Sequence, residues 1–235
     1  MKKSRSKVLA AIAGLSLVAF AGTSYAATGL FGGAVEENGH ISLVSNTSDV
    51  SSANDYSSVS FDVAAGTTFA SLDALSADFN VTDDMCAGGS PRFQIALDTG
   101  SETKNMFVYL GDAPNYNDCD QNTWIGSTNL LSGALSVDTS QLPGGTFYDT
   151  YAHALTAYGA YPVVSIHLVA DGGWAASDGE QTVLVDNVVI GDASYDFDPA
   201  PPALSKEDCK KGGWKNFENP SFKNQGQCVS YANHN

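Results

Sequence analysis

Short segments in which apolar and polar residues alternate recur along this chain, and this pattern is typical of half-buried β-strands. The clearest of them lie at residues 40–44, 58–63, 92–97, 105–110 and 163–170, and turn-forming residues separate them. The turn at 98–104 joins two of these segments as an antiparallel hairpin. One helix is predicted at 148–157. About eight strands and one short helix predict an all-β fold, an antiparallel β-sandwich of the jelly-roll type.

We predict that the rest of this fold is arranged around the segment 171–197. It reads as a loop, a strand, a turn and a short closing strand. Val183, Val185, Val188 and Ile190 are branched and apolar, as a half-buried strand prefers. Beyond the turn, Tyr195 and Phe197 are two residues apart and therefore face the same way.

The first 26 residues have the features of a secretory signal peptide. Four basic residues precede an apolar run at 8–20, and Ser24-Tyr25-Ala26 is a small-x-small cleavage site. The apolar run is shorter than the roughly 20 residues that a spanning helix needs. We therefore predict a protein that is secreted, either extracellular or associated with the cell envelope, without a membrane span.

The rest of the chain is strongly acidic. Loss of the leader changes the formal net charge from −15 to −19, because four of the eleven basic residues lie in it. Of the seven that remain, only Arg92 and Lys104 precede residue 204. This charge argues against nucleic acid and anionic membranes as partners of the acidic part.

Composition divides the chain into a signal peptide at 1–26, a β-sandwich domain at 27–197, a Pro-rich linker at 198–204 and a small C-terminal module at 205–235. The prolines predict a stiff linker of polyproline character. Within the C-terminal module, one short helix is predicted from Ser205 to the pair Gly212-Gly213, and a second at 225–232. The oligomeric state stays open.

Four cysteines in a secreted chain are expected to form disulfides, and four cysteines allow three connectivities. Pairing Cys86 with Cys119 and Cys209 with Cys228 keeps one bridge in each module, and this is the pairing we predict. Each bridge should stabilise the fold by about 3 kcal/mol. A metal site is the less favoured alternative, because the spacing contains no CxxC pair and no nearby His completes a set.

No motif indicates catalysis, and we predict no catalytic residue. The four histidines that follow the leader lie in no nucleophile or zinc motif. His167 falls in the apolar strand 163–170, where alternation places it with Val163 and Ser165, opposite Val164, and where a structural role is the simpler interpretation. Acidic pairs are abundant, but a glycosidase needs two carboxylates at a fixed separation.

A structural Ca²⁺ ion is the one cofactor that the sequence suggests. Asp171, Asp178, Glu180 and Asp186 offer hard oxygen ligands, and the glycines between them let backbone carbonyls turn inward. The spacing of an EF-hand is missing. Solvated acids at surface turns are the alternative.

Four aromatic residues are the candidate ligand-binding residues: Trp124, Trp174, Tyr148 and Tyr151, all in or near predicted loops. Exposed rings stack on sugar rings, while neighbouring polar side chains bond the hydroxyl groups. The alternative is that the two tryptophans close the ends of the sandwich. In the C-terminal module, lysines interleave with aromatic residues, which suits an anionic polymer or a glycan.

Two resemblances add to this interpretation. The sequence VLVDNVVI at 183–190 resembles the last strand of galactose-binding-like jelly rolls, and many bacterial carbohydrate-binding modules end in a similar pattern. That resemblance implies a jelly-roll body, often with a Ca²⁺ ion, and sugars bound by aromatic residues of loops or of a concave face. The stretch CKKGGWKNFENPSFKNQGQCVSYAN at 209–233 is similar to a C-terminal segment of otherwise different secreted bacterial proteins. It implies an exported bacterial protein with a portable module.

We therefore expect a secreted, non-enzymatic module that binds an extracellular glycan or a cell-envelope polymer. Two alternatives remain. One is a structural or adhesive surface protein that attaches through its C-terminal module. The other is a glycoside or polysaccharide hydrolase.

Overall fold

The computed structural model describes residues 29–47, 55–86, 88–110, 119–132, 137–176, 178–198, 205–217 and 221–233. The predicted signal peptide at 1–26 and all of the predicted linker beyond Asp198 lie outside the described residues. No helix in the described ranges is long and apolar enough to cross a membrane.

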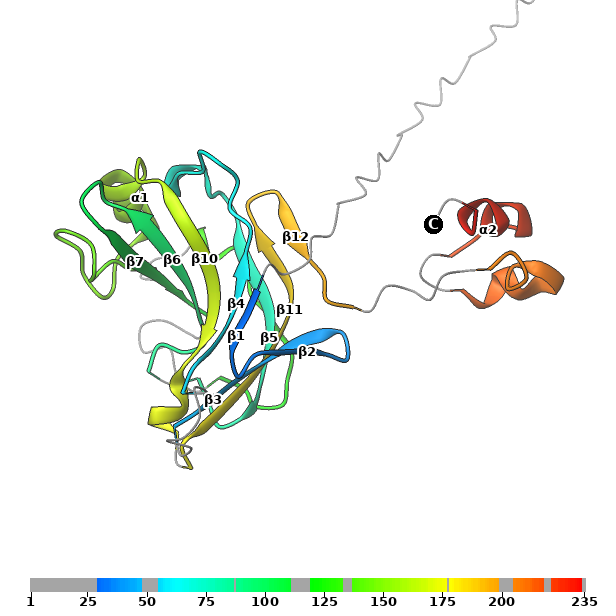
Figure 1. Ribbon diagram of the computed structural model, residues 1–235, viewed down its shortest axis with the longest axis horizontal. Coiled ribbons are helices and arrows are strands. Elements are labelled where there is room, and N and C mark those ends of the chain that lie inside the picture. Colours follow the sequence, from blue (N-terminus) through cyan, green and yellow to red (C-terminus); the bar gives the residue numbers. More distant parts are fainter. Residues whose placement is uncertain are drawn as a thin grey trace, which may run out of the picture.

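Two antiparallel sheets pack face to face (Figure 1). Sheet 1 has the order β1-β4-β10-β6-β7-β9, formed by Gly29–Gly32, Ser57–Phe61, Val163–Ala170, Arg92–Asp98, Thr103–Tyr109 and Val137–Asp138. Sheet 2 has the order β2-β3-β11-β5-β8, formed by Val35–Glu37, His40–Asn46, Glu180–Ile190, Leu75–Asp83 and Ile125–Gly126. The short strand β12, Ala193–Tyr195, pairs with β11.

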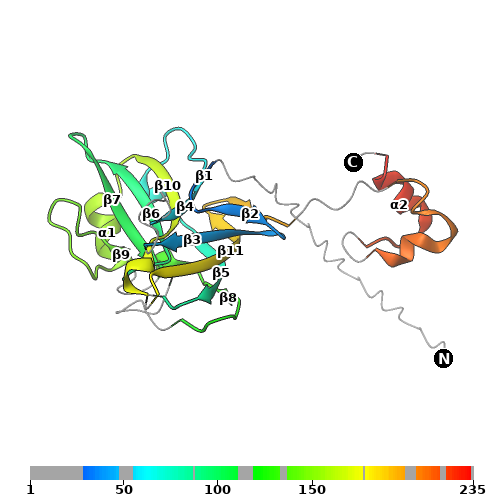
Figure 2. The ribbon, with the colours of Figure 1, turned by 60° about the horizontal axis from the view of Figure 1, so that its bottom comes forward.

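The strand order confirms the predicted β-sandwich. Along the chain, β3, β5, β8 and β11 of sheet 2 alternate with β4, the hairpin β6–β7 and β10 of sheet 1, and the two layers are distinct in Figure 2. This alternation of successive strands between two sheets is the connectivity of a jelly roll. β11 lies between β3 and β5, so the segment at 171–197 supplies a central strand as its pattern predicts.

The core fills the space between the inner faces of the two sheets. Val183, Val185 and Val188 of β11 are fully buried in it, and Tyr195 packs edge-on against Phe61 across the sandwich. The single α-helix of the described sandwich, α1 at Tyr151–Tyr158, begins where the Thr150 side chain accepts a hydrogen bond from the backbone N–H of His153. It therefore starts later than the predicted residue 148. Three short 3₁₀ helices, η1, η2 and η3, lie at Phe69–Ser71, Leu130–Ser132 and Gly172–Ala175.

β10 departs from strict alternation. Its register against β6 shifts between Val163 and Ser165, which is the signature of a β-bulge. Val163 and Ile166 are both buried, whereas Val164 is 53% exposed. The prediction that Val163 shares a face with Ser165 and His167 is therefore wrong, because the bulge inserts one residue into the alternation.

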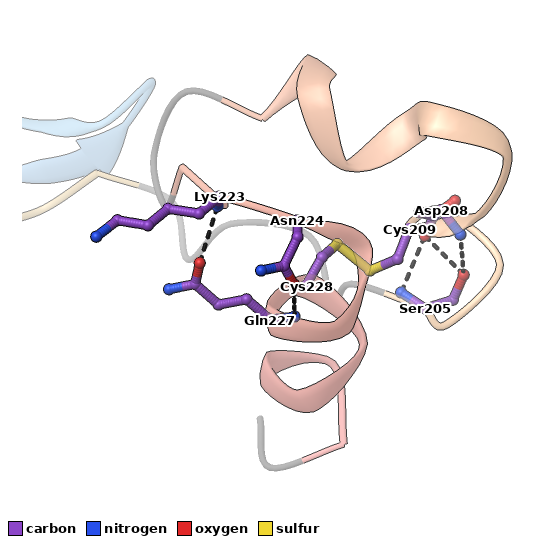
Figure 3. Close-up of a disulfide and its surroundings, with 7 residues drawn as sticks. All are labelled: Ser205, Asp208, Cys209, Lys223, Asn224, Gln227 and Cys228. Atoms are coloured by element: carbon purple, nitrogen blue, oxygen red, sulfur yellow. Dashed lines mark hydrogen bonds between the residues drawn. A yellow bond between two sulfur atoms is a disulfide. The ribbon is translucent and has the colours of Figure 1, made fainter.

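The C-terminal module has a small apolar core of its own. Cys209, Phe222 and Cys228 are buried in it, with Trp214 and Phe217 packed against them. Figure 3 shows the Cys209–Cys228 disulfide. With Cys86–Cys119, it confirms the predicted pairing.

The helices of this module differ in part from those predicted. Ser205 to Asp208 form a turn, in which the Asp208 carboxylate accepts hydrogen bonds from the backbone N–H and the hydroxyl group of Ser205 (Figure 3). The 3₁₀ segment η4, at Lys210–Asn216, is broken by a kink at Lys211 and Gly212, whose φ values are +53° and +88°. The helix predicted from Ser205 is therefore a turn that leads into 3₁₀ geometry, whereas its predicted end at Gly212-Gly213 coincides with this kink. The second helix, α2 at Gln225–Tyr231, lies where it was predicted, and Asn224 caps it.

Candidate functional site: a groove on the outer face of sheet 1

The outer face of sheet 1 carries a groove of about 670 Å³. This volume lies in the range of small-molecule sites. Strands β1, β4, β6 and β10 supply its floor, and the loops before β4 and after β10 supply its rim. Eleven side chains line it: Phe31, Thr47, Asp55, Tyr56, Ser58, Arg92, Gln94, His167, Val169, Asp171 and Trp174.

Three of these side chains are exposed aromatic rings. Phe31 is 45% exposed, Tyr56 44% and Trp174 67%. Large exposed rings that gather around one groove are more informative than the same rings scattered singly over a surface. The remaining groove residues add hydroxyl, amide, imidazole and carboxylate groups, so the groove combines flat apolar surfaces with hydrogen-bonding groups.

An ion pair closes one end of the groove floor. Both terminal nitrogens of Arg92 donate to the carboxylate of Asp171, each at 2.5 Å, and one of them also donates to the backbone carbonyl of Gly89 at 3.1 Å. The guanidinium lies 4.9 Å from the ring centre of Phe107. A bidentate pair of this kind fixes both side chains in position. It also neutralises the one Lys or Arg side chain that lines the groove in the described part of the chain.

His167 lies at the middle of the groove floor, on β10. Its ring centre is 5.7 Å from that of Phe31, and Ser58 Oγ lies 3.5 Å from its Nδ1. Burial lowers the pKa of His167 below its usual value, because the charged imidazolium loses hydration there. The ring is therefore neutral at pH 7 and offers one hydrogen-bond donor and one acceptor.

Trp174 belongs to η3 and packs against the backbone of a glycine. A Cβ atom on Gly88 would lie only 2.3 Å from the indole ring, and Gly88 also has a positive φ of 59°. Both the close approach and the left-handed backbone require glycine. The loop that carries Gly88 therefore supports the indole from one side while the rest of the ring stays exposed.

A buried polar network holds the loop that carries Asp171 and Trp174. At its centre is Gln181 of β11, which is fully buried. Its side-chain oxygen accepts from the Ser90 hydroxyl at 2.7 Å and from the Gly172 N–H at 3.1 Å, and its nitrogen donates to the carbonyl of Met85 at 2.7 Å. The Ser90 hydroxyl in turn accepts from the N–H of Asp171 at 2.9 Å. A network that is satisfied in this way gives the rim a fixed shape.

The four aromatic candidates from the sequence lie in different places. Trp174 lines the groove. Trp124 directly precedes β8 in sheet 2, where its ring meets that of His40 with centres 6.1 Å apart. Tyr151 packs edge-on against Phe69 and donates a hydrogen bond to a backbone carbonyl.

Tyr148, the fourth candidate, follows β9 at the edge of sheet 1 and is 48% exposed. Of the four, only Trp174 is among the groove residues.

Several groove residues were not predicted from the sequence, among them Phe31, Tyr56, Arg92 and Gln94. One signal was present, because Arg92 and Gln94 alternate with the apolar residues Phe93 and Ile95 and so had to face away from the core. That signal could not show which strands would lie beside β6.

The acidic residues predicted to bind Ca²⁺ do not form one cluster in the described structure. Asp171 pairs with Arg92, and Glu180 accepts a hydrogen bond from Asn46 at 2.6 Å. Asp178 accepts from the N–H of Glu180 at 3.1 Å.

Asp186, the fourth acid of that set, lies instead with Asp196 and Asp198, and the carboxylate oxygens of the three are within 4.8 Å of one another. Asp196 and Asp198 were missed, although their alternation with Tyr195 and Phe197 points them to the opposite side from these two rings. Carboxylates at this spacing fit a divalent cation, so Asp186 keeps its place among the candidate ligands and the ion itself stays a prediction.

Mutual repulsion in this cluster predicts a pH effect on stability. Burial raises the pKa of Asp186, and the neighbouring charges of Asp196 and Asp198 raise it further, against hydrogen bonds from the N–H groups of Phe197 and Asn187. The folded state therefore holds this proton more tightly than the unfolded state, so the cluster lowers stability as pH rises through the raised pKa of Asp186. In EDTA at pH 7, Asp196→Asn should increase the free energy of unfolding by about 0.5 kcal/mol.

Urea denaturation at pH 7 and at pH 3 measures this effect. The gain should shrink at pH 3, where Asp186, whose pKa is raised, is largely protonated and the repulsion is weaker. Asp192→Asn, in the turn between β11 and β12 and outside the cluster, is the control and should change little. A loss of stability in Asp196→Asn at pH 7 in EDTA would contradict the repulsion. Repeating the series with Ca²⁺ tests the predicted ion, which would reverse the sign of the effect.

One His–carboxylate pair lies outside the groove. Nδ1 of His153 is 2.8 Å from the Asp149 carboxylate, which also accepts from the Thr139 hydroxyl and the Thr150 N–H. Burial raises the pKa of Asp149, but the hydrogen bonds from His153, Thr139 and Thr150 outweigh it, and the pKa is lowered. The pair fastens the start of α1 to the loop after β9.

Comparison with known proteins gives no family assignment. No protein-family model matches the chain, and neither a curated protein nor a solved structure matches it. The groove is therefore interpreted from its own geometry and chemistry.

Proposed function

We propose that this protein is a secreted, non-enzymatic module that binds carbohydrate, and that sugars bind in the groove of sheet 1. The observation that carries the proposal is the gathering of Phe31, Tyr56 and Trp174 around a floor of hydrogen-bonding side chains. Sugar rings have apolar faces that stack on aromatic rings and hydroxyl groups that need directed polar partners, so a site of this composition suits them.

Several features favour binding over hydrolysis. The Asp171 carboxylate is held by both terminal nitrogens of Arg92, so it is not free to serve as a nucleophile or a base. His167 faces Ser58 and Phe31, and no hydrogen bond or ion pair joins it to a carboxylate in the described residues. A rigid, satisfied floor is what a binding surface requires, because it costs little conformational entropy when the ligand arrives.

The disulfides support the proposed location. Both pairs of cysteines are bridged, and the described residues contain no free cysteine. Bridges of this kind form and persist in oxidising compartments outside the cytosol. Together with the predicted signal peptide, they favour an extracellular or envelope-associated protein.

A binding screen tests this function. Residues 27–235 should bind at least one member of a panel of neutral plant, fungal and bacterial polysaccharides, measured by affinity electrophoresis and by glycan array. Binding should persist in EDTA, because no carboxylate of the Asp186 cluster lines the groove. It should also change little between low and high salt, because the contacts are stacking and neutral hydrogen bonds. Binding of no neutral glycan would contradict the proposal.

A further inference from the structure

The groove occupies only part of the outer face of sheet 1. Antiparallel pairing places residues that lie opposite one another on the same face of the sheet. One such row crosses five strands and consists of Ser60, His167, Gln94, Phe107 and Asp138, on β4, β10, β6, β7 and β9. His167 and Gln94 line the groove, so the same face continues past them to β9.

The row does not end at β9. The segment after it runs back beside it, because Val137 forms an antiparallel β-bridge with Asp149 and exchanges backbone hydrogen bonds with it at 2.8 and 3.4 Å. This register places Tyr148 opposite Asp138. Tyr148 therefore lies at the edge of the face that carries Phe107 and Asp138.

The far end of this face is held as firmly as the groove. Asp138 is 2% exposed and accepts a hydrogen bond from the Tyr109 hydroxyl at 2.6 Å. Asp149, next to Tyr148, is fixed by Thr139, Thr150 and His153. Tyr148 thus stands on a rigid base at the edge of sheet 1.

The span of the face exceeds a single sugar. From Phe31 on β1 to Tyr148, the face crosses the four strands β4, β10, β6 and β7, and then β9. At about 4.8 Å between neighbouring strands, this amounts to roughly 29 Å. A linear chain of several sugar units is needed to reach from one end to the other.

The charges favour a neutral chain. Between residues 27 and 204 there are 23 acidic residues against the two basic residues Arg92 and Lys104. Arg92 is already neutralised by Asp171. A polyanion would meet repulsion and no free cation in the groove.

We infer that the groove is one end of a longer binding face, and that this face takes a linear, neutral polysaccharide that lies across the strands of sheet 1, with Tyr148 as its distal contact. This inference rests on the proposed sugar-binding function. It adds the class of ligand, the orientation of the polysaccharide across the strands and a contact outside the groove.

A length series tests it. The affinity of residues 27–235 is measured by isothermal titration with linear β-1,4-linked oligosaccharides of glucose, mannose and xylose, each from two to six units. In the series that binds, affinity should rise with chain length. Tyr148→Ala should weaken binding of the longest member by about tenfold and leave the shortest unchanged, because only a long chain reaches the edge of the sheet. Trp124→Ala, at a 46% exposed ring beside sheet 2, is the control and should behave as the wild type.

The outcomes separate this inference from the function on which it rests. Binding with the same affinity at every length, or an unchanged affinity of Tyr148→Ala for the longest member, would overturn the long face and leave sugar binding in the groove intact. Binding of none of the three series, in a protein that also fails the wider screen of neutral polysaccharides, would overturn both. If the protein binds a polysaccharide of the wider screen but no linear oligosaccharide prepared from it, the inference of a linear ligand is overturned and sugar binding stands.

Discussion

Replacing Gln181 with leucine should lower the free energy of unfolding by about 3 kcal/mol and weaken sugar binding by about tenfold. Leucine fills a similar volume but leaves the Gly172 N–H, the Ser90 hydroxyl and the Met85 carbonyl without their buried partner. Each orphaned group costs about 1 kcal/mol. Binding should weaken because the loop of Asp171 and Trp174 loses an anchor.

Urea denaturation and calorimetric titration at a temperature where the variant is folded measure the two effects separately. Gln141→Leu, at an exposed glutamine, is the control and should change stability by less than about 0.5 kcal/mol. A variant that binds as tightly as the wild type despite the loss of stability would show that this network does not position the site.

Trp174→Ala should weaken binding strongly and leave the stability of the fold nearly unchanged. The indole is 67% exposed, so its loss should change the free energy of unfolding by less than about 0.5 kcal/mol. Binding of the preferred glycan should nevertheless fall by about 30-fold, because the loss of a large stacking ring costs about 2 kcal/mol of binding free energy. Isothermal titration gives the affinity, and thermal unfolding checks that the fold is kept.

Trp174→Phe refines the same prediction. Phenylalanine keeps a flat ring on the Gly88 backbone but offers a smaller stacking surface. Its affinity should therefore lie between those of the wild type and Trp174→Ala. An affinity of Trp174→Phe equal to that of Trp174→Ala would show that the indole contributes through its N–H group and not by stacking.

The sandwich could be predicted because its signals are local. The alternation of apolar and polar residues along β6 and β7 predicts a hairpin from a few neighbouring residues. The cysteine pairing follows from the composition of the two modules. The branched residues of the segment at 171–197 predict β11. Local alternation fails only where a bulge breaks it, as it does between Val163 and Ser165 of β10.

The site could not be predicted in the same way, because it depends on strand order. Arg92 and Asp171 form their ion pair across 79 positions of sequence, and Ser58 meets His167 across 109. These contacts exist only because the jelly-roll order inserts β10 between β4 and β6. Loop aromatics such as Trp124 and Trp174 look alike in the sequence, yet they lie beside different sheets.

The central claim is that sugar binds on the outer face of sheet 1, and parallel titration of Trp174→Ala and Trp124→Ala tests it most directly. Trp124 is a matched control, since its indole is also exposed, at 46%, but lies beside sheet 2. We predict a loss of affinity of about 30-fold for Trp174→Ala and an affinity within about twofold of the wild type for Trp124→Ala. A loss in Trp124→Ala with wild-type affinity in Trp174→Ala would contradict the claim and move the binding site to sheet 2.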